Sequence, residues 1–189
     1  HPLDWKEFVK NEEDRCYLCK HRMYSTFRNH METGGLSCLI DGTNTDDLKS
    51  HRPGLRAIRE LGVRMPLAEA GFDKIDVRSL SRQLGLTTWD RPSASCLATR
   101  IPVGMEITSQ RLRQIEVFEK GLGRLSLPGC RVRLSSSYQD VVCLEISTQN
   151  FEMVADSDIR SEILRFFNDH GVKKVLLNLE GRVQVAQSQ

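Results

Sequence analysis

The stretch LSCLIDG, residues 36–42, is a short apolar run that closes with an aspartate and a glycine. This pattern is typical of a buried parallel strand followed by a turn. The stretch RPGLRAIRELG, residues 52–62, follows with the period of a helix, since Pro53 suits a first helical turn and Gly62 suits a helix end. A strand followed by a helix is the repeating unit of an α/β layer.

A second helix with the same organisation comes next. In FDKIDVRSLSRQLG, residues 72–85, Asp73 is placed to cap a helix. Ile75, Leu80 and Leu84 are spaced to face inward, and Gly85 marks the end. Short strands between helices therefore predict an α/β fold for the first half of the chain.

The pattern changes after about residue 101. Thr108 precedes an amphipathic helix, and CRVRL (130–134) and VVCLEI (141–146) flank a polar turn, which predicts a hairpin. A helix over 156–170, a strand in 172–179 and a final edge strand RVQVA (182–186) complete this part. We predict an α/β domain over 1–104 and a smaller α+β domain over 105–189.

Composition narrows the class of protein. The chain has 189 residues, of which 27 are basic and 25 acidic, so its net charge of +2 gives no general attraction for nucleic acid. We find no apolar run long enough for a membrane helix and no secretion signal in the sequence. We therefore expect a cytoplasmic globular protein with free thiols rather than a disulfide framework.

Cys16 and Cys19 form a Cys-x-x-Cys pair within a helix-compatible stretch. Two thiols one helical turn apart can hold a metal or a cluster, can form a redox dithiol, or can be two ordinary cysteines. Cys96 becomes a third ligand if the fold brings it beside Cys16, and three cysteines leave one iron of a [4Fe-4S] cluster open.

Cys96 lies in RPSASCLATR, residues 91–100, among small residues that allow close approach of a backbone or a substrate. Arg100 can stabilise a thiolate or bind an anion there. The alternative is a tight connection with a buried cysteine.

Polar residues in IDGTNTDD, residues 40–47, directly follow the predicted strand. Ligands bind at strand ends in open α/β sheets, so Thr43 and Asn44 can meet a base or phosphate, and Asp46 or Asp47 can bind Mg²⁺ or a ribose. A solvated turn and helix cap explains the same residues.

Arg131 and Arg133 occupy alternate positions of a predicted strand and so share one face. Two guanidinium groups suit a phosphate or carboxylate, although an outward-facing pair of like charges is also common. Glu119, late in the preceding helix, can join them or a metal, or lie on the surface.

Taken together, DRCYLCK (14–20), the region from Asp41 to Thr108 and RVRL (131–134) resemble the LarE family of ATP-dependent sacrificial sulfur transferases. This family is a branch of the PP-loop ATP pyrophosphatases, so the resemblance implies a Rossmann-like parallel sheet in the first domain. It also implies sulfur insertion in nickel-pincer nucleotide cofactor biosynthesis, which serves lactate racemase. Family members adenylate a carboxylate of pyridinium-3,5-biscarboxylic acid mononucleotide and convert it to a thiocarboxylate.

The resemblance places the sulfur chemistry at Cys96, with two possible sources. In single-cysteine members the thiolate displaces AMP, and Cβ–S cleavage then leaves dehydroalanine in place of the cysteine. A second group uses three cysteines around a [4Fe-4S] cluster, here Cys16, Cys19 and Cys96. We favour the cluster, because Cys16 and Cys19 otherwise have no role.

Other positions follow from the resemblance. Gly42, Thr43, Asn44 and Asp46 correspond to the nucleotide-side loop for ATP and Mg²⁺, and Arg100 corresponds to an active-site anion contact. Glu119, Arg131 and Arg133 correspond to a substrate-phosphate or metal cluster at a subunit junction. The resemblance also implies a homo-oligomer, either a trimer or a hexamer built from two trimers, and a small-molecule nucleotide substrate, with no membrane partner.

One feature departs from the family. PP-loop enzymes carry a Ser-Gly-Gly-x-Asp-Ser turn that binds ATP phosphates, and this sequence has no glycine-rich turn before Gly34. We expect the phosphate loop to lie outside the stretch shown and this stretch alone to be inactive. Two alternatives remain: another PP-loop thiolase or amide ligase, and a non-catalytic cluster-binding fragment.

Overall fold

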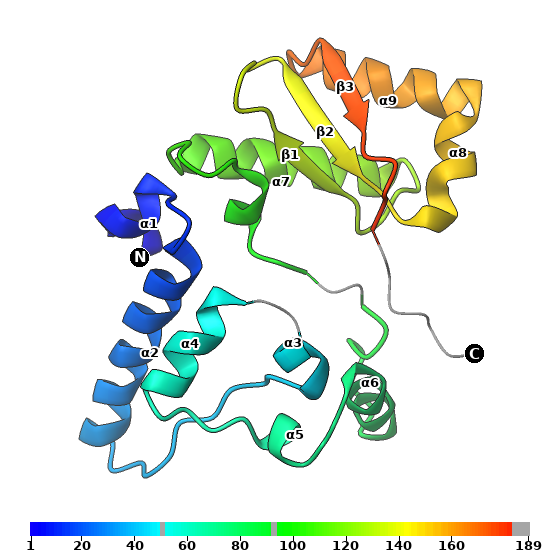
Figure 1. Ribbon diagram of the computed structural model, residues 1–189. Coiled ribbons are helices and arrows are strands. Elements are labelled where there is room, and N and C mark those ends of the chain that lie inside the picture. Colours follow the sequence, from blue (N-terminus) through cyan, green and yellow to red (C-terminus); the bar gives the residue numbers. More distant parts are fainter. Residues whose placement is uncertain (50–51, 92–93, 183–189) are drawn as a thin grey trace. The chain divides into compact units, whose positions relative to one another are not determined.

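The computed structural model describes residues 1–49, 52–91 and 94–182, which form two compact units (Figure 1). The first unit is His1–Arg91, and the second contains the described residues from 94 onward. Residues 94–104 thus belong to the second unit, whereas we placed the boundary after residue 104. The assignment of these units to two functional domains stays a prediction.

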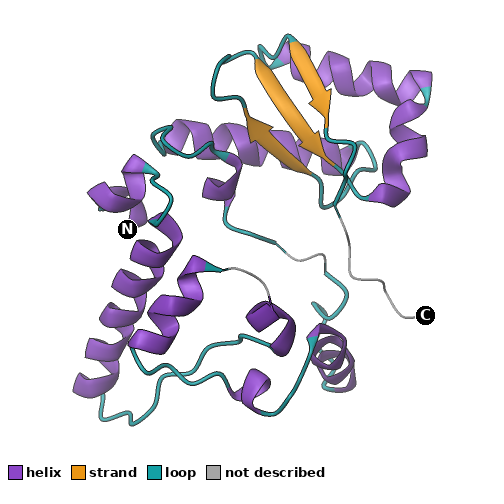
Figure 2. Cartoon of the chain, viewed as in Figure 1, coloured by secondary structure: helices purple, strands orange, loops and turns teal. Residues whose placement is uncertain are grey.

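The first unit is built from helices and connecting loops, and no strand occurs among its described residues (Figure 2). Its elements are η1 (Pro2–Asp4), α1 (Lys6–Lys10), α2 (Arg15–Thr33), α3 (Thr45–Lys49), α4 (Pro53–Glu60), α5 (Pro66–Glu69) and α6 (Lys74–Gln83). The predicted helices in 52–62 and 72–85 are confirmed as α4 and α6. Gly62, with a φ of 66°, follows α4. The Rossmann-like parallel sheet is not shown by this structure.

The long helix α2 packs against α4 and makes a small core. Tyr24 of α2 lies in one buried cluster with Leu55 and Ile58 of α4 and with Val63. Ile58 is fully buried because α4 presents its apolar stripe to α2. This packing fixes the part of α2 that carries Tyr24.

The predicted buried strand at 36–42 is wrong in its burial. Leu36 is 65% exposed and Ile40 is 63% exposed. The segment forms a single parallel bridge, between Ile40 and Arg64. A parallel strand is buried when neighbours and covering helices enclose it, and within the described residues this segment has that one neighbour.

The prediction that the apolar residues of α6 face inward is also wrong, for the same reason. Ile75 is 46% exposed and Leu84 is 68% exposed, although Asp73 caps the helix as expected. Periodicity identified the helix correctly, but no sheet among the described residues of this unit covers its apolar face.

The second unit holds all three described strands, in the order β1-β2-β3. Strand β1 (Arg131–Leu134) and strand β2 (Val141–Glu145) form the predicted antiparallel hairpin, and β3 (Lys174–Leu177) is parallel to β2. The other elements of this unit are η2 (Leu97–Arg100), α7 (Ser109–Arg124), η3 (Thr148–Asn150), α8 (Phe151–Ala155) and α9 (Ser157–Asp169).

Helices α7 and α9 cover one face of this sheet (Figure 1). Phe118 of α7 and Phe167 of α9 pack with Val132, Val142 and Leu144 of the strands in one buried core. Because side chains alternate along a strand, the neighbouring positions point to the opposite face of the sheet. These opposite positions in β1 and β2 are Arg131, Arg133, Val141, Cys143 and Glu145.

The predicted edge strand RVQVA begins at Arg182, which forms a parallel bridge with Ser147, while residues 183–186 lie outside the described residues. Among the helices of the described residues, none combines the length and the apolar character needed to cross a bilayer.

Candidate functional site

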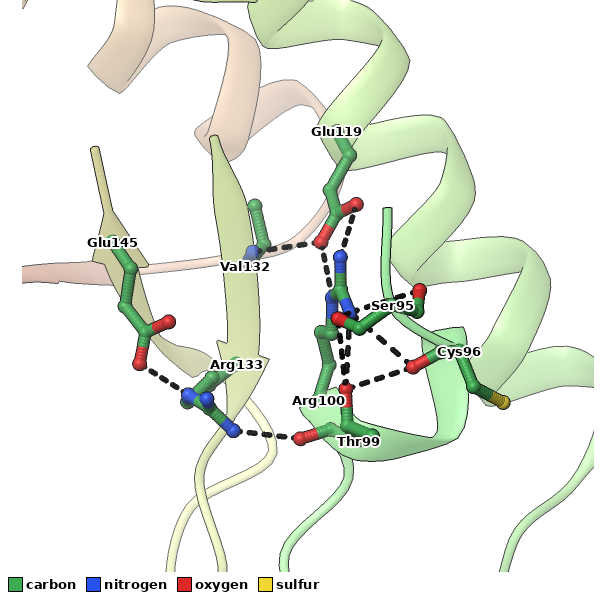
Figure 3. A network of polar contacts seen from close by, with 8 residues as sticks. All are labelled: Ser95, Cys96, Thr99, Arg100, Glu119, Val132, Arg133 and Glu145. Carbon is green, nitrogen blue, oxygen red and sulfur yellow. Dashed lines mark hydrogen bonds and ion pairs between the residues drawn. The ribbon is translucent and has the colours of Figure 1, made fainter. Parts of the chain in front are cut away.

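Cys96 lies at the start of the short 3-10 turn η2, and its thiol is free and exposed. Its carbonyl oxygen accepts hydrogen bonds from the Thr99 amide at 3.0 Å, the Thr99 hydroxyl at 2.8 Å and the Arg100 guanidinium at 3.2 Å. The sulfur points away from these donors (Figure 3). The turn therefore fixes the backbone of Cys96 and leaves its sulfur accessible.

Arg100 ties this turn to helix α7. The residue is 4% exposed, and it makes a two-point ion pair with Glu119, at 2.7 Å from Nε to Oε1 and 3.1 Å from Nη2 to Oε2. Its Nη1 donates to the carbonyl of Ser95 at 3.2 Å and to the Ser95 hydroxyl. All three guanidinium nitrogens therefore donate to protein acceptors, and contact of Arg100 with a bound anion stays a prediction.

Glu119 also connects α7 to the sheet. Its carboxylate accepts a third hydrogen bond, at Oε1 from the Val132 amide at 3.1 Å, and its side chain is 17% exposed. Burial raises the pKa of the neighbouring Cys130 thiol to about 12, and the negative charge of Glu119 adds to this effect. Glu119 therefore joins the Cys96 turn, α7 and β1, and its predicted contact with substrate phosphate or metal remains untested.

Arg133 connects the same turn to the hairpin. Its Nη1 donates to the Thr99 carbonyl at 2.6 Å, and its Nε forms an ion pair with Glu145 of β2. The structure thus connects Arg100, Glu119 and Arg133 through the turn that begins at Cys96 (Figure 3).

Arg131 lies on the same face of β1 as Arg133. Among the described residues, its buried Nε has no hydrogen-bond partner. Burial lowers the pKa of Arg131, and the positive charges of Arg182 and Arg100 lower it further. Burial likewise lowers the pKa of Arg182, and Arg100 adds to that effect. This concentration of guanidinium groups makes the region electropositive and suited to an anion.

The sequence analysis missed several members of this network: Ser95, Thr99, Glu145 and Arg182. Glu145 could have been predicted from the hairpin, because its register places Glu145 opposite Arg131 on the same face. No local signal in the sequence identified Ser95 or Thr99 as members of this network. They belong to it because the Arg100 guanidinium folds back and donates to atoms of its own turn.

The loop after the bridge at Ile40 is organised by Asp41. This carboxylate accepts hydrogen bonds from the Thr43 amide at 2.8 Å, from the Thr43 hydroxyl and from the Tyr24 hydroxyl, and Lys20 lies 3.8 Å away. Burial alone raises the pKa of Asp41, but these hydrogen bonds and the charge of Lys20 outweigh it, so the pKa is lowered. Burial raises the pKa of Tyr24, and the Asp41 hydrogen bond raises it further.

The predicted nucleotide-side residues follow Asp41. Asn44 and Asp47 cap helix α3 reciprocally, because each backbone amide donates to the other's side chain, at 3.3 and 3.1 Å. Asp46 accepts from Lys49 at 2.9 Å and from the Lys74 amide at 3.1 Å, and the Lys49 hydrogen bond is the main cause of its lowered pKa. The helix-cap interpretation therefore describes the geometry of Asn44.

Gly42 and Thr43 complete this loop. Nothing lies within 4 Å of the position that a Cβ would take at Gly42, so its backbone is open to a neighbouring molecule. Thr43 is 5% exposed. Contact of this loop with ATP stays a prediction.

Cys16 and Cys19 lie in the first turns of α2, and both are partly exposed cysteines outside any disulfide. The buried Arg15 guanidinium donates to the sulfur of Cys16 at 3.3 Å. Both cysteines belong to the first unit and Cys96 belongs to the second, so a common cluster stays a prediction. Across the described ranges 1–49, 52–91 and 94–182, no three His, Cys, Asp or Glu side chains are grouped to hold a metal ion.

Comparison with known proteins finds relatives along most of the chain, although no family model matches it. An uncharacterized protein of Synechocystis is 37% identical over 174 residues, which are 92% of this chain and 64% of that protein. An uncharacterized protein of Methanocaldococcus jannaschii is 33% identical, over 92% of this chain and 66% of that protein.

A third relative has an assigned activity. The pyridinium-3,5-bisthiocarboxylic acid mononucleotide synthase of Lactiplantibacillus plantarum is 32% identical over 171 residues, which are 90% of this chain and 60% of that enzyme. The chain therefore spans less than two thirds of the length of the curated relatives it matches, and its similarity to that enzyme includes both structural units.

Proposed function

We propose that this protein is a LarE-type sulfur transferase that converts a carboxylate of pyridinium-3,5-biscarboxylic acid mononucleotide into a thiocarboxylate. The main support is the similarity to the Lactiplantibacillus plantarum synthase over 90% of the chain. The geometry agrees with this proposal, because the second unit holds both an exposed Cys96 thiol and a concentration of guanidinium groups.

ATP activates the carboxylate in this proposal by forming an acyl-adenylate. We assign ATP contact to the loop of Gly42, Thr43, Asn44 and Asp46, of which Gly42 presents open backbone. Mg²⁺ is a weaker fit, because the Asp46 carboxylate already binds Lys49 and the Lys74 amide, and Asp47 is paired with Arg52 at 2.8 Å. We therefore assign no step to a magnesium ion.

Arg131 and Arg133 bind the phosphate of the mononucleotide in this proposal. Arg131 offers a buried Nε without a hydrogen-bond partner among the described residues. A dianionic phosphate supplies acceptors for such a donor and offsets the repulsion between neighbouring guanidinium groups. A homotrimer or hexamer, which the resemblance implies, would place this face near a subunit junction.

Cys96 delivers or holds the sulfur. In the sacrificial route its thiolate attacks the acyl carbon and AMP leaves, which gives a thioester. Loss of the Cys96 α-proton and cleavage of Cβ–S then release the thiocarboxylate and leave dehydroalanine.

In the other route Cys16, Cys19 and Cys96 are ligands of a [4Fe-4S] cluster. The donor chemistry fits, since all three are cysteines outside any disulfide and all three are at least partly exposed. Such a cluster would supply a bound sulfide for transfer. In that case the protein residues serve as ligands and are not consumed.

The test is thiocarboxylate production by the full chain with ATP and the biscarboxylic mononucleotide. We expect Cys96→Ala to abolish product, because both routes need this sulfur atom. The control Cys38→Ala changes an exposed cysteine of the first unit and is expected to leave activity intact. Full activity of Cys96→Ala would refute the proposal.

The same preparation identifies the sulfur source. Intact-protein mass after turnover reveals loss of one H₂S at Cys96 in the sacrificial route. Iron and acid-labile sulfide, both abolished in Cys16→Ala, identify the cluster route.

A further inference from the structure

Cys96 is held in a backbone conformation that bears directly on whether it can lose its sulfur. Its φ is −54° and its ψ is 133°. Viewed along the Cα–C bond, the bonds from Cα to N, Cβ and H are about 120° apart. At this ψ, the Cα–H bond of an L-residue therefore lies close to the plane of the residue's own carbonyl group. A proton in that plane is poorly placed for removal, because the electron pair left behind cannot overlap with the carbonyl π system.

We propose that Glu119, acting through Arg100, holds Cys96 in a conformation that resists β-elimination. This inference rests on the proposed sulfur chemistry for its significance, although the geometry stands without it. Glu119 is then a positioning residue and does not need to touch the substrate.

The Cys96 carbonyl group cannot easily rotate. Rotation about Cα–C would bring the α-proton out of the plane, but it would break contacts at the carbonyl oxygen. That oxygen accepts from the Thr99 amide, from the Thr99 hydroxyl and from Arg100 Nη1. Two of these three donors are side-chain groups, so the turn is held by more than its backbone.

Glu119 holds the Arg100 guanidinium in place. Its guanidinium is buried and faces Glu119 with two nitrogens, so its third nitrogen is aimed at Ser95, Cys96 and Thr99. Glu119 is itself fixed to β1 through the Val132 amide. The sheet and α7 thereby set the position of the Cys96 carbonyl.

Hydrogen-bond donors at the Cys96 carbonyl oxygen have an opposing effect, which favours elimination. Donors on a carbonyl oxygen stabilise an enolate, and one such donor is worth about 10²–10³ in rate when the geometry is right. That gain depends on charge reaching the oxygen, and an in-plane Cα–H bond prevents this delocalisation. The alignment effect therefore dominates while the turn keeps its present conformation.

The consequence is a specific order of events. In the sacrificial route, base removes the Cys96 α-proton, the C–H electron pair forms the Cα=Cβ bond, and the Cβ–S pair leaves on the thiocarboxylate. Water or hydroxide at the exposed residue accepts the proton. This elimination requires the turn to open first, whereas nucleophilic attack by sulfur or binding of iron does not.

The test needs neither ATP nor the mononucleotide, so it is independent of the proposed function. An alkyl dibromide that alkylates the same thiol twice converts cysteine into a cyclic sulfonium. This step releases two bromide ions and the thiol proton. Base then removes the α-proton, and the cyclic sulfide leaves to give dehydroalanine. Peptide mass spectrometry measures the rate of this step at Cys96 in the unsubstituted chain and in each variant. Each rate is divided by the rate of the same site in denaturant.

We expect elimination at Cys96 to be at least about tenfold slower in the folded chain than in denaturant, a difference of about 1.4 kcal/mol in barrier. Glu119→Gln keeps the size of the side chain but places an amide NH₂ against an Arg100 donor, and it is expected to raise the Cys96 rate about tenfold. Thr99→Val removes the hydroxyl from the carbonyl and is expected to raise it severalfold.

The matched controls are Glu116→Gln, which breaks an exposed ion pair with Lys120 in the same helix, and Thr148→Val, which alters another 3-10 turn of the same unit. Neither is expected to change the Cys96 rate. Equal rates at Cys96 in the folded chain and in denaturant would overturn the proposal. It is also overturned if Glu119→Gln and Thr99→Val both slow elimination, since the donors would then be promoting it.

Discussion

The two units of this chain use their apolar residues very differently. In the second unit, three strands and helices α7 and α9 share one core that includes Phe118 and Phe167, each at most 1% exposed. In the first unit, α2 and α4 enclose a small cluster around Ile58, while Leu36 and Leu84 are more than 60% exposed. The second unit therefore satisfies its own hydrophobic pattern, and the first leaves part of it uncovered.

This difference separates the candidate residues as well. Arg100, Glu119 and Arg133 are fixed by contacts to the well-packed sheet. The nucleotide-side loop around Asp41 is attached to the smaller core through Tyr24. We expect the Cys96 network to be the more rigid of the two regions, because local stability follows buried apolar contact.

The largest expected effect comes from opening the core of the second unit. Phe118→Ala removes a fully buried ring and is expected to lower the free energy of unfolding by about 3–5 kcal/mol. The measurement is urea unfolding followed by far-ultraviolet circular dichroism. Trp5 and Trp89, the two tryptophans of the chain, both lie in the first unit, so their fluorescence reports that unit separately.

The matched variant is Ile58→Ala, which opens the core of the first unit at a cost of about 2–4 kcal/mol. It is expected to move the fluorescence transition to lower urea, and Phe118→Ala is expected to leave that transition in place. If both probes shift together in both variants, the units unfold as one and the comparison fails.

The extent to which the sequence predicted this fold follows the same division. The hairpin of 130–146, the caps at Asp73 and Thr108 and the helix of 156–170 depend on nearby residues, and all are present. The buried strand at 36–42 depends on distant partners that cover both of its faces. A local apolar run carries no information about whether such partners are supplied.

The candidate site shows the same limit at the level of side chains. The sequence analysis identified Cys96, Arg100, Glu119 and Arg133 as chemically capable residues. It did not predict that Arg100 would turn its guanidinium toward Glu119 and the backbone of its own turn, since a pairing between residues 19 positions apart depends on how η2 packs against α7.

The next effect tests the anchoring of the nucleotide-side loop. Asp41→Asn removes a charged acceptor of three hydrogen bonds and is expected to cost about 1–3 kcal/mol in the first unit. Because the folded pKa of Asp41 is lowered, its stabilisation is complete above the ordinary aspartate pKa and is lost as the pH falls through the lower folded value. Fluorescence-detected unfolding between pH 5 and pH 2 measures this.

The variant is expected to lose that part of the acid sensitivity, so the stabilities of the two proteins should converge toward low pH. An Asp41→Asn chain that remains as far below the unsubstituted chain at pH 2 as at pH 5 would contradict this assignment. Glu13→Gln is a useful control, because it changes an exposed carboxylate of the same unit.

The smallest expected effect sharpens the comparison, because it should be equal in the two units. Asp73 accepts from the amides of Ile75 and Asp76 at the start of α6, and Thr108 accepts from the Arg111 amide at the start of α7. Asp73→Ala and Thr108→Ala are each expected to cost about 1 kcal/mol, measured by fluorescence and by circular dichroism respectively. A helix cap satisfies backbone groups within one turn, so its value does not depend on how well the rest of the unit is packed. A cost at Asp73 far below that at Thr108 would mean that α6 contributes little to the stability of the first unit. The exposed apolar face of α6 is consistent with such a small contribution.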